Sequence, residues 1–271
     1  MRVVRGLTDA SMRPAIPILM YHEVAHGDHG AFRKYVVSPE AFRRQMAVLS
    51  RLGYRPITMD ALVANRRDGR RLDGRPVVIS FDDGFAGVID HAVPVLEAHG
   101  FTAMFYLVSD LVGTRSRWLH AERGVELGLF DWSTARSLQS RGFGVGSHSA
   151  THSRLPALDD ATCRAELEGS RATISDQIGH EVADLAYPFG AYDRRVQGIA
   201  VDCGYRSACS VLIGLSPRDD DLLALRRVPV DATASLLDFV ARLTTGRLLA
   251  GAIGSSLHRA RRTLASMKHG R

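Results

Sequence analysis

Two short stretches of the sequence place side chains of metal-binding types directly after apolar runs. In "ISFDDGF" the adjacent carboxylates Asp82 and Asp83 follow such a run, and in "GVGSHSATH" another run leads to His148 and His152. Neighbouring carboxylates repel each other and are costly to remove from water, so a pair at the end of a strand indicates a nearby cation. Two histidines at positions i and i+4 and one carboxylate form a three-ligand set that leaves open positions for water and substrate.

The two adjacent carboxylates are expected to have different roles. The hypothesis assigns Asp83, His148 and His152 to a divalent cation and leaves Asp82 free to accept a proton from water. Each motif alone has a simpler interpretation, a turn for Asp-Asp-Gly and a solvated helix face for His-x-x-x-His. Their joint occurrence, each after its own apolar strand, favours a catalytic metal site.

The elements that must position these residues alternate between strand and helix patterns. Strands are expected at 16–21, 76–81, 101–108, 142–147, 182–188, 205–211 and 223–230, and helices at 39–53, 88–99, 131–141, 159–178, 192–203 and 233–245. Continuous apolar strands that alternate with helices indicate a parallel sheet covered by helices. About seven such units predict an α/β fold, a distorted (β/α) barrel, whose functional sites form at the carboxyl ends of the strands.

The 271-residue chain divides into three expected parts, an N-terminal extension (1–15), the barrel domain (16–245) and a basic C-terminal tail (246–271). Within the barrel domain, the polar stretch 64–75 is expected to be an exposed loop. In the tail, apolar residues recur every three or four positions, which predicts an amphipathic helix with a basic far side. Two interpretations stay open: this helix docks on the body of the protein, or it makes a peripheral contact with a membrane or an anionic glycan.

Composition excludes some classes of protein. The net charge is +6, but no basic run is interleaved with aromatic residues, so no nucleic-acid partner is expected. Cys163, Cys203 and Cys209 are too few and too widely spaced for a disulfide framework. No secretory signal and no apolar stretch long enough to span a membrane stand out. A cytoplasmic location is therefore expected, with membrane association through the tail as the alternative.

Three motifs resemble those of the polysaccharide deacetylases, a group of carbohydrate esterases. "SFDDG" and "HSATH" are similar to the first two motifs of that family, and "YPFG", which contains Tyr187 and Phe189, resembles the third. The resemblance covers about residues 16–230. It implies a distorted (β/α) barrel and a metal-dependent hydrolase that removes N-acetyl groups from an N-acetylated sugar or polysaccharide.

The resemblance also implies roles for single residues. The metal would be divalent, commonly zinc in this family, with Asp83 and the two histidines as its ligands and Asp82 as the general base. A backbone N–H near Phe189, next to Tyr187, would help to bind the oxyanion that forms during amide hydrolysis.

The sequence departs from the family pattern at two positions. The arginine that usually precedes the proline-aromatic pair is absent, so Arg226 or Arg227 in "LRRVPV" is the candidate to orient the base. The leucine-x-x-histidine motif of many members is missing near the C-terminus, but "LMYH" ending at His22 has this form. Since the first and last strands of a closed barrel are neighbours, this arrangement is similar to the permuted poly-N-acetylglucosamine deacetylase branch. It implies His22 as the general acid.

Several alternatives stay open. His22 is either that general acid or a strand-end histidine bonded to a backbone carbonyl. Trp118 and His120, in a long connection, either contact sugar rings or have a structural role. The missing arginine supports a carbohydrate-binding protein without strong catalysis, and the same chemistry on a small non-sugar amide or cyclic imide is a third possibility.

Overall fold

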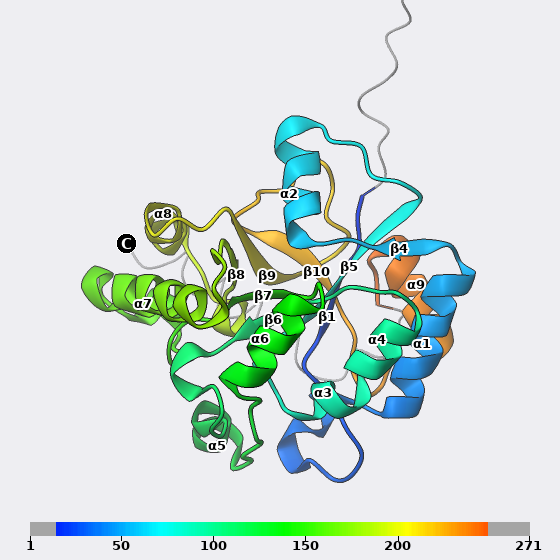
Figure 1. Ribbon diagram of the computed structural model, residues 1–271, viewed down its shortest axis with the longest axis horizontal. Coiled ribbons are helices and arrows are strands. Elements are labelled where there is room, and N and C mark those ends of the chain that lie inside the picture. The colour runs from blue at the N-terminus through cyan, green and yellow to red at the C-terminus, as the bar shows by residue number, and fades with distance from the viewer. Residues whose placement is uncertain (1–14, 249–271) are drawn as a thin grey trace, which may run out of the picture.

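Parallel strands close into a barrel in the computed structural model, which describes residues 15–248 (Figure 1). Around the barrel the order is β1-β10-β9-β8-β7-β6-β5, and β5 pairs again with β1. This confirms the predicted distorted (β/α) barrel of about seven strands. The barrel strands are β1 (Ile18–Tyr21), β5 (Arg75–Phe81), β6 (Met104–Leu107), β7 (Gly144–Ser147), β8 (Asp184–Ala186), β9 (Ser207–Ile213) and β10 (Leu225–Pro229). Outside it, β4 (Tyr54–Pro56) extends the sheet from β5, and β2 (Glu23–Val24) pairs with β3 (Val36–Val37).

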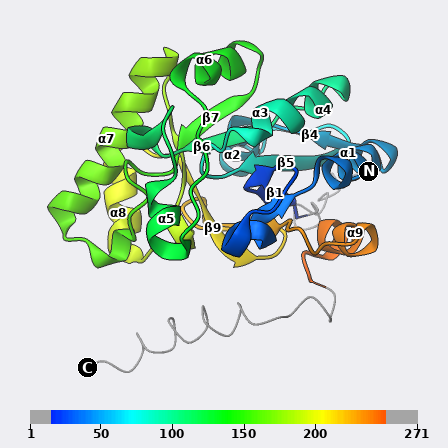
Figure 2. The same cartoon turned by 90° about the horizontal axis from the view of Figure 1, so that it is seen from below.

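Helices surround the barrel, as Figure 2 shows from a second direction. Most begin at a Ser, Thr or Asp whose side chain accepts a hydrogen bond from the first turn, as Ser38 does from Ala41 N–H. Their bounds are α1 (Pro39–Arg51), α2 (Met59–Asp68), α3 (Gly87–His91), α4 (Val93–Ala98), α5 (Arg117–Arg123), α6 (Trp132–Ser140), α7 (Asp160–Ile178), α8 (Arg194–Asp202) and α9 (Leu236–Thr245).

Alternation along the strands decides which side chains reach the barrel interior. In β5, Ile79 and Phe81 pack in the large core cluster beneath the helices. Val78 instead packs with Ile18 and Met104 in a separate cluster. Because successive side chains of a strand point to opposite faces, Asp82 continues on the side of Val78, toward the interior.

The structure differs from the sequence-based expectations in several boundaries. The helix expected at 88–99 is broken at Ala92, since Pro94 lacks an N–H and cannot continue the ladder of hydrogen bonds. Part of the expected loop 64–75 is helical, as the end of α2. The short α5 interrupts the long connection after β6.

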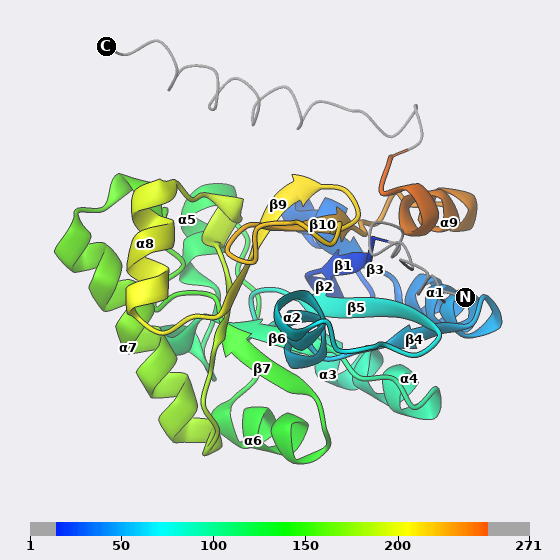
Figure 3. The same cartoon turned by 90° about the horizontal axis from the view of Figure 1, so that it is seen from above.

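Figure 3 places β9, β10 and α9 along the same side of the molecule. None of the helices within residues 15–248 combines the length and the apolar character needed to cross a bilayer. The amphipathic helix predicted in the tail lies, from residue 249 onward, outside the described part of the chain.

Candidate active site

The carboxyl ends of β5 and β7 bring the two chemical motifs together. Asp83 is the second residue after β5, and His148 follows β7 directly, with β6 as the strand between them. His152 lies one short loop further along the chain. Although His148 is 65 residues beyond Asp83 in the sequence, the parallel order of the strands places both motifs at one edge of the barrel.

Asp83, His148 and His152 converge on a common point. Their potential ligand atoms all lie within 4.8 Å of one another. The Nε2 atom of His148 is 3.4 Å from Asp83 Oδ1, and the Nε2 atom of His152 is 3.3 Å from the same oxygen. All three residues are buried, with exposed fractions of 4%, 3% and 7% in that order. Three buried side chains that meet in this way are suited to bind a cation in tetrahedral coordination and leave at least one position open.

The hydrogen bonding of these three residues fits a cation. Asp83 Oδ1 is buried without a hydrogen-bond partner among the described residues. The Nδ1 atom of His148 lies 2.6 Å from the carbonyl oxygen of Ala186, which can only accept, so Nδ1 donates and Nε2 presents a lone pair to the cluster. Burial raises the pKa of Asp83, but the imidazoles of His148 and His152 lower it more, so that it lies well below its usual range.

Glu166 of α7 holds the loop that separates the two histidines. Its Oε2 atom accepts hydrogen bonds from the backbone N–H groups of Ala150 (3.0 Å) and Thr151 (2.9 Å). Its Oε1 atom accepts from the Thr151 hydroxyl at 2.5 Å. The Glu166 side chain is buried, so these hydrogen bonds are shielded from water and fix the course of the loop.

Two serines within the motif complete this support. The Ser147 hydroxyl oxygen accepts from Ser149 N–H at 3.2 Å, and the Ser149 hydroxyl oxygen accepts from His152 N–H at 3.0 Å. Within residues 15–248, the only non-glycine residues with positive φ belong to this region: Asp83, Ser149, His152 and Phe189. Such conformations cost of order 1–3 kcal/mol each and persist only where the surroundings impose them.

Asp82 does not join the cluster but forms an ion pair with Arg227 of β10. The two guanidinium nitrogens lie 2.7 Å from the two carboxylate oxygens, and Arg227 Nε donates to the Ser210 carbonyl at 2.9 Å. Arg227 is 1% exposed. Burial alone would raise the pKa of Asp82, but the charge and hydrogen bonds of Arg227 hold it below its ordinary value.

Of the two candidate arginines, only Arg227 points to the site. Arg226 lies on the other face of β10, is about half exposed and pairs with Asp220 at 3.4 Å. Alternation along the strand explains why neighbouring arginines differ so strongly.

His22 lies level with Asp82 because β1 and β5 pair in parallel with Tyr21 opposite Phe81. Its ring contacts Tyr35, with centroids 5.1 Å apart. No described hydrogen bond joins the His22 ring to a backbone carbonyl. Burial lowers the pKa of His22, and the nearby charges of Asp83 and Asp82 raise it in part.

A pocket of about 390 Å³ is lined by the cluster residues together with Asp82 and His22. Its wall near the cluster is aromatic: Trp118 stacks on His152 with centroids 4.6 Å apart, and Phe189 meets the same ring edge-on at 4.5 Å. The Arg154 guanidinium covers the other part of Phe189, 3.8 Å from its centroid. Tyr187 also lines the pocket, but its hydroxyl donates to the Leu223 carbonyl at 2.9 Å, so its ring serves as a wall.

Sequence reasoning missed Glu166 and gave little weight to Trp118. The signal for Glu166 is its place on the stripe of Cys163, Leu167 and Ile174 in the predicted helix, which puts a carboxylate on the buried face. Trp118 could be singled out as an aromatic residue in a long connection, but its stacking on His152 depends on how that connection folds back over the barrel.

The protein is therefore a (β/α) barrel with a buried cluster of one carboxylate and two histidines. A second carboxylate, Asp82, lies beside this cluster and is paired with Arg227. The profile of the polysaccharide deacetylase family matches residues 69–208, about half of the chain. The chain therefore belongs to this family, as the motifs predicted.

Individual relatives cover more of the chain. The Bacillus subtilis protein YxkH is 24% identical over 219 residues, which are 80% of this chain and 72% of the relative. The poly-beta-1,6-N-acetyl-D-glucosamine N-deacetylase of Escherichia coli K12 is 23% identical over 84% of this chain, but this chain spans only 38% of that protein. A crystal structure of a polysaccharide deacetylase from Bacillus cereus superposes with a TM-score of 0.72 at 26% identity, over 85% of this chain and 69% of that chain.

Proposed function

We propose that the protein is a metal-dependent hydrolase that removes N-acetyl groups from an N-acetylated sugar or polysaccharide. The observation that carries the proposal is the pairing of a convergent Asp83, His148 and His152 cluster with an Asp82 that Arg227 keeps out of it. Membership of the polysaccharide deacetylase family supports the same reaction.

Asp83, His148 and His152 would hold a divalent cation, and the ligand set of two imidazoles and one carboxylate suits zinc. When bound, such a cation supplies Lewis acidity toward the amide carbonyl and activates a water molecule. The remaining steps are proton transfers and charge stabilisation, which belong to the side chains and the backbone around the cluster.

Asp82 is the proposed general base. Its carboxylate stays ionised at neutral pH because Arg227 lowers its pKa, and the bidentate contact fixes its orientation. Arg227 thus has the task that the family assigns to the arginine missing before the proline-aromatic pair. This contact removes the main support for a carbohydrate-binding protein without catalysis.

His22 is the proposed general acid, which donates a proton to the departing amine. It lines the same pocket as Asp82 and directly follows β1, the strand that pairs with β5. The backbone N–H near Phe189 is the proposed oxyanion donor, and Tyr187 and Phe189 shape the wall against the acetyl group.

The proposed substrate is a glycan with N-acetylglucosamine units. This choice comes from the E. coli relative, whose name states that it acts on poly-beta-1,6-N-acetyl-D-glucosamine. A small non-sugar amide is the competing substrate, and a parallel screen of such amides distinguishes the two.

Acetate release from N-acetylglucosamine oligomers tests the proposal. We expect release that a chelator abolishes and that added zinc restores, together with about one bound metal ion per chain. Activity that persists in a metal-free sample would contradict the metal site. Metal binding without acetate release from any oligomer would contradict the proposed reaction.

A further inference from the structure

Large apolar side chains are exposed on one side of the molecule. Among residues 15–248, five of the seven large hydrophobic residues that are at least 36% exposed belong to two segments. We call them the apolar rim: Val211, Leu212 and Ile213 at the end of β9, and Leu236 and Leu237 at the start of α9. Leu237 is 80% exposed. A concentration of exposed apolar residues in a soluble fold marks an interaction surface.

The two segments of the rim lie on the same side of the barrel, as Figures 2 and 3 both show for β9 and α9. The C-terminal end of α9, at the other end of the helix from Leu236 and Leu237, meets the turn after β9. A Cβ atom added to Gly246 would lie 2.5 Å from the backbone nitrogen of Leu215. Leu248, which follows Gly246, lines the candidate active-site pocket together with Val211 and Ile213. The β9 segment of the rim therefore borders that pocket, and the α9 segment lies on the same side of the molecule.

A strongly basic segment continues from this position. After Leu248, residues 249–271 contain no Asp or Glu and five cationic residues, which nearly equal the net charge of +6 of the whole chain. These are Arg259, Arg261, Arg262, Lys268 and Arg271. The described part of the chain thus ends beside the β9 segment of the apolar rim, where a basic stretch without acidic residues begins.

We propose that the apolar rim docks on an anionic phospholipid bilayer, with residues 249–271 supplying the electrostatic attraction. Apolar side chains that enter the headgroup region and cationic residues that meet anionic lipids reinforce each other, and one signal alone gives weak binding. An anionic polysaccharide as the partner would bind the cationic residues but would leave the apolar residues of the rim without a partner. Docking of the basic segment on the rim itself uses the apolar residues but leaves the cations unpaired, since the rim contains no acidic residue.

The position of the rim also suggests the physical state of the substrate. Because Val211 and Ile213 belong both to the rim and to the pocket wall, docking brings the pocket mouth close to the bilayer surface. A glycan that is attached to a lipid fits this arrangement. The inference of a lipid-attached substrate rests on the proposed deacetylase function, whereas the proposed docking on a bilayer does not.

Vesicle co-sedimentation of the full chain tests the docking. The probes are vesicles of phosphatidylcholine with about 30 mol% phosphatidylglycerol, and vesicles of phosphatidylcholine alone. We expect binding to the anionic vesicles that weakens as salt is raised. The variant Leu212→Ser/Leu237→Ser should bind about tenfold more weakly, since neither side chain lines the pocket and both are exposed. The matched control is Leu52→Ser, an exposed leucine at the opposite end of the barrel, which should bind like the parent.

A second variant, Arg259→Gln/Arg261→Gln/Arg262→Gln, should lose the preference for anionic vesicles. Unchanged vesicle binding of the leucine variant would overturn the proposal. Dextran sulfate, which meets only the cations, should bind equally to the parent and the leucine variant, and weaker binding by the leucine variant would also overturn the proposal. Tighter vesicle binding by the leucine variant would show that the basic segment covers the rim in the free protein. That result would also overturn the proposed docking of the rim on a bilayer. Acetate release from a soluble oligomer, measured on the same samples, separates a failure of docking from a failure of the proposed function.

Discussion

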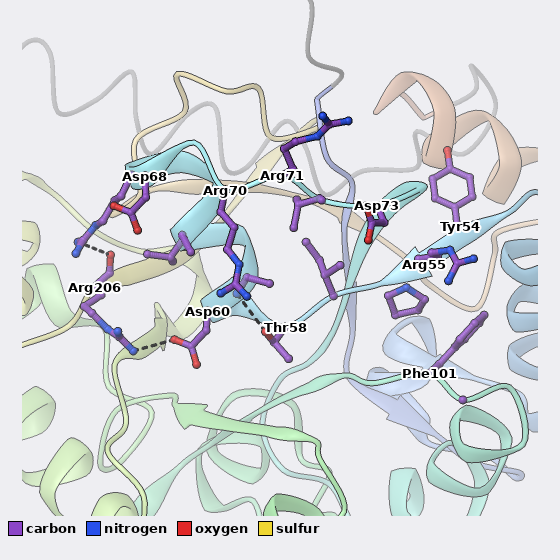
Figure 4. A pocket seen from close by; sticks show the side chains of 18 of the residues that line it. Tyr54, Arg55, Thr58, Asp60, Asp68, Arg70, Arg71, Asp73, Phe101 and Arg206 are labelled. Atoms are coloured by element: carbon purple, nitrogen blue, oxygen red, sulfur yellow. Dashed lines mark hydrogen bonds and ion pairs between the residues drawn. The ribbon is translucent and has the colours of Figure 1, made fainter. Parts of the chain in front are cut away.

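The two ends of the barrel differ in what their hollows contain. The pocket at the carboxyl ends of the strands measures about 390 Å³ and holds buried ionisable groups that contact one another. The hollow at the amino ends is larger, about 1340 Å³, and Figure 4 shows it bordered by charged side chains such as Arg55, Arg70 and Asp73. The larger of these two hollows is therefore not the one with the chemistry.

Burial explains the difference between the two ends. At the amino end, Arg206 and Asp60 form an ion pair at 2.8 Å, but both side chains are about half exposed, so water screens the interaction. At the carboxyl end, Arg227 and Asp82 form an ion pair at 2.7 Å, and their side chains have almost no exposure. Only the second pair can hold a charge in a fixed orientation against a substrate. Matched substitutions at the two ends test this contrast.

The largest effect is expected for Asp82→Asn. Loss of the general base should reduce the turnover number for acetate release by about 10²–10⁴-fold, with metal content unchanged. Metal analysis and steady-state kinetics on the same preparation check both parts. The control Asp60→Asn, at the amino end, should keep parental turnover. An Asp82→Asn enzyme of full activity would reject the proposed base.

Arg227→Met should lower the free energy of unfolding by about 3–5 kcal/mol, because it leaves the Asp82 carboxylate buried without its partner. The control Arg206→Met removes the exposed partner of Asp60 and should lower the free energy of unfolding by no more than about 1 kcal/mol. Urea denaturation measures both. Equal losses in the two variants would show that burial does not distinguish the two ends.

Glu166→Gln should weaken metal binding by about 10–100-fold, because one of its oxygens becomes an NH₂ group that cannot accept the hydrogen bonds of the histidine loop. Competition with a chromophoric chelator measures the affinity. Glu168→Gln changes an exposed residue of the same helix and should leave the affinity unchanged. If Glu166→Gln loses overall stability but binds metal normally, then Glu166 supports only the fold.

A smaller effect is expected for Glu23, which is buried in β2 close to the site. Burial raises its pKa from 4.5 to about 8, although hydrogen bonds from backbone N–H groups, including that of Val24, lower it in part. The folded protein therefore binds this proton more tightly than the unfolded chain does. The contribution of Glu23 to stability should be fully present below pH 4.5 and decrease as the pH rises toward 8.

Glu23→Gln removes this titration and keeps the shape of the side chain. In chelator-treated protein, the free energy of unfolding of the variant should equal that of the parent near pH 4.5. Above pH 8 it should be higher than that of the parent by about 1 kcal/mol or more. Glu181→Gln, at the exposed amino end, should show no such divergence. Parallel stability curves for the parent and Glu23→Gln across this pH range would contradict the assignment.

The fold could be predicted from the sequence because its signal is local and repeated. Apolar strands and capped helices alternate along most of the chain, and the break at Pro94 was the main error within a predicted helix. The convergence of Asp83 with His148 was also predictable, since both residues lie within two positions of the carboxyl end of a parallel strand. Their chemical roles stay predictions.

The parts that could not be predicted depend on contacts between distant segments. Alternation implies that Arg226 and Arg227 face opposite ways, but the direction of each depends on how β10 pairs with its neighbours. Similarly, Glu166 reaches the histidine loop only because α7 packs beside β7. Helical spacing places Glu166 on the buried face of α7, three residues after Cys163 and four before Ser170, and leaves Glu168 exposed, but it does not reveal the partner of Glu166.

The left-handed backbone at Asp83, Ser149, His152 and Phe189 limits how this site can be transplanted. A peptide with the sequence "HSATH" would not adopt these angles alone, because non-glycine residues avoid them. Grafting the motif onto another scaffold would therefore require the surrounding framework as well, including a buried carboxylate in the place of Glu166. Engineers who wish to reuse the chemistry would do better to keep this barrel and exchange the outer loops.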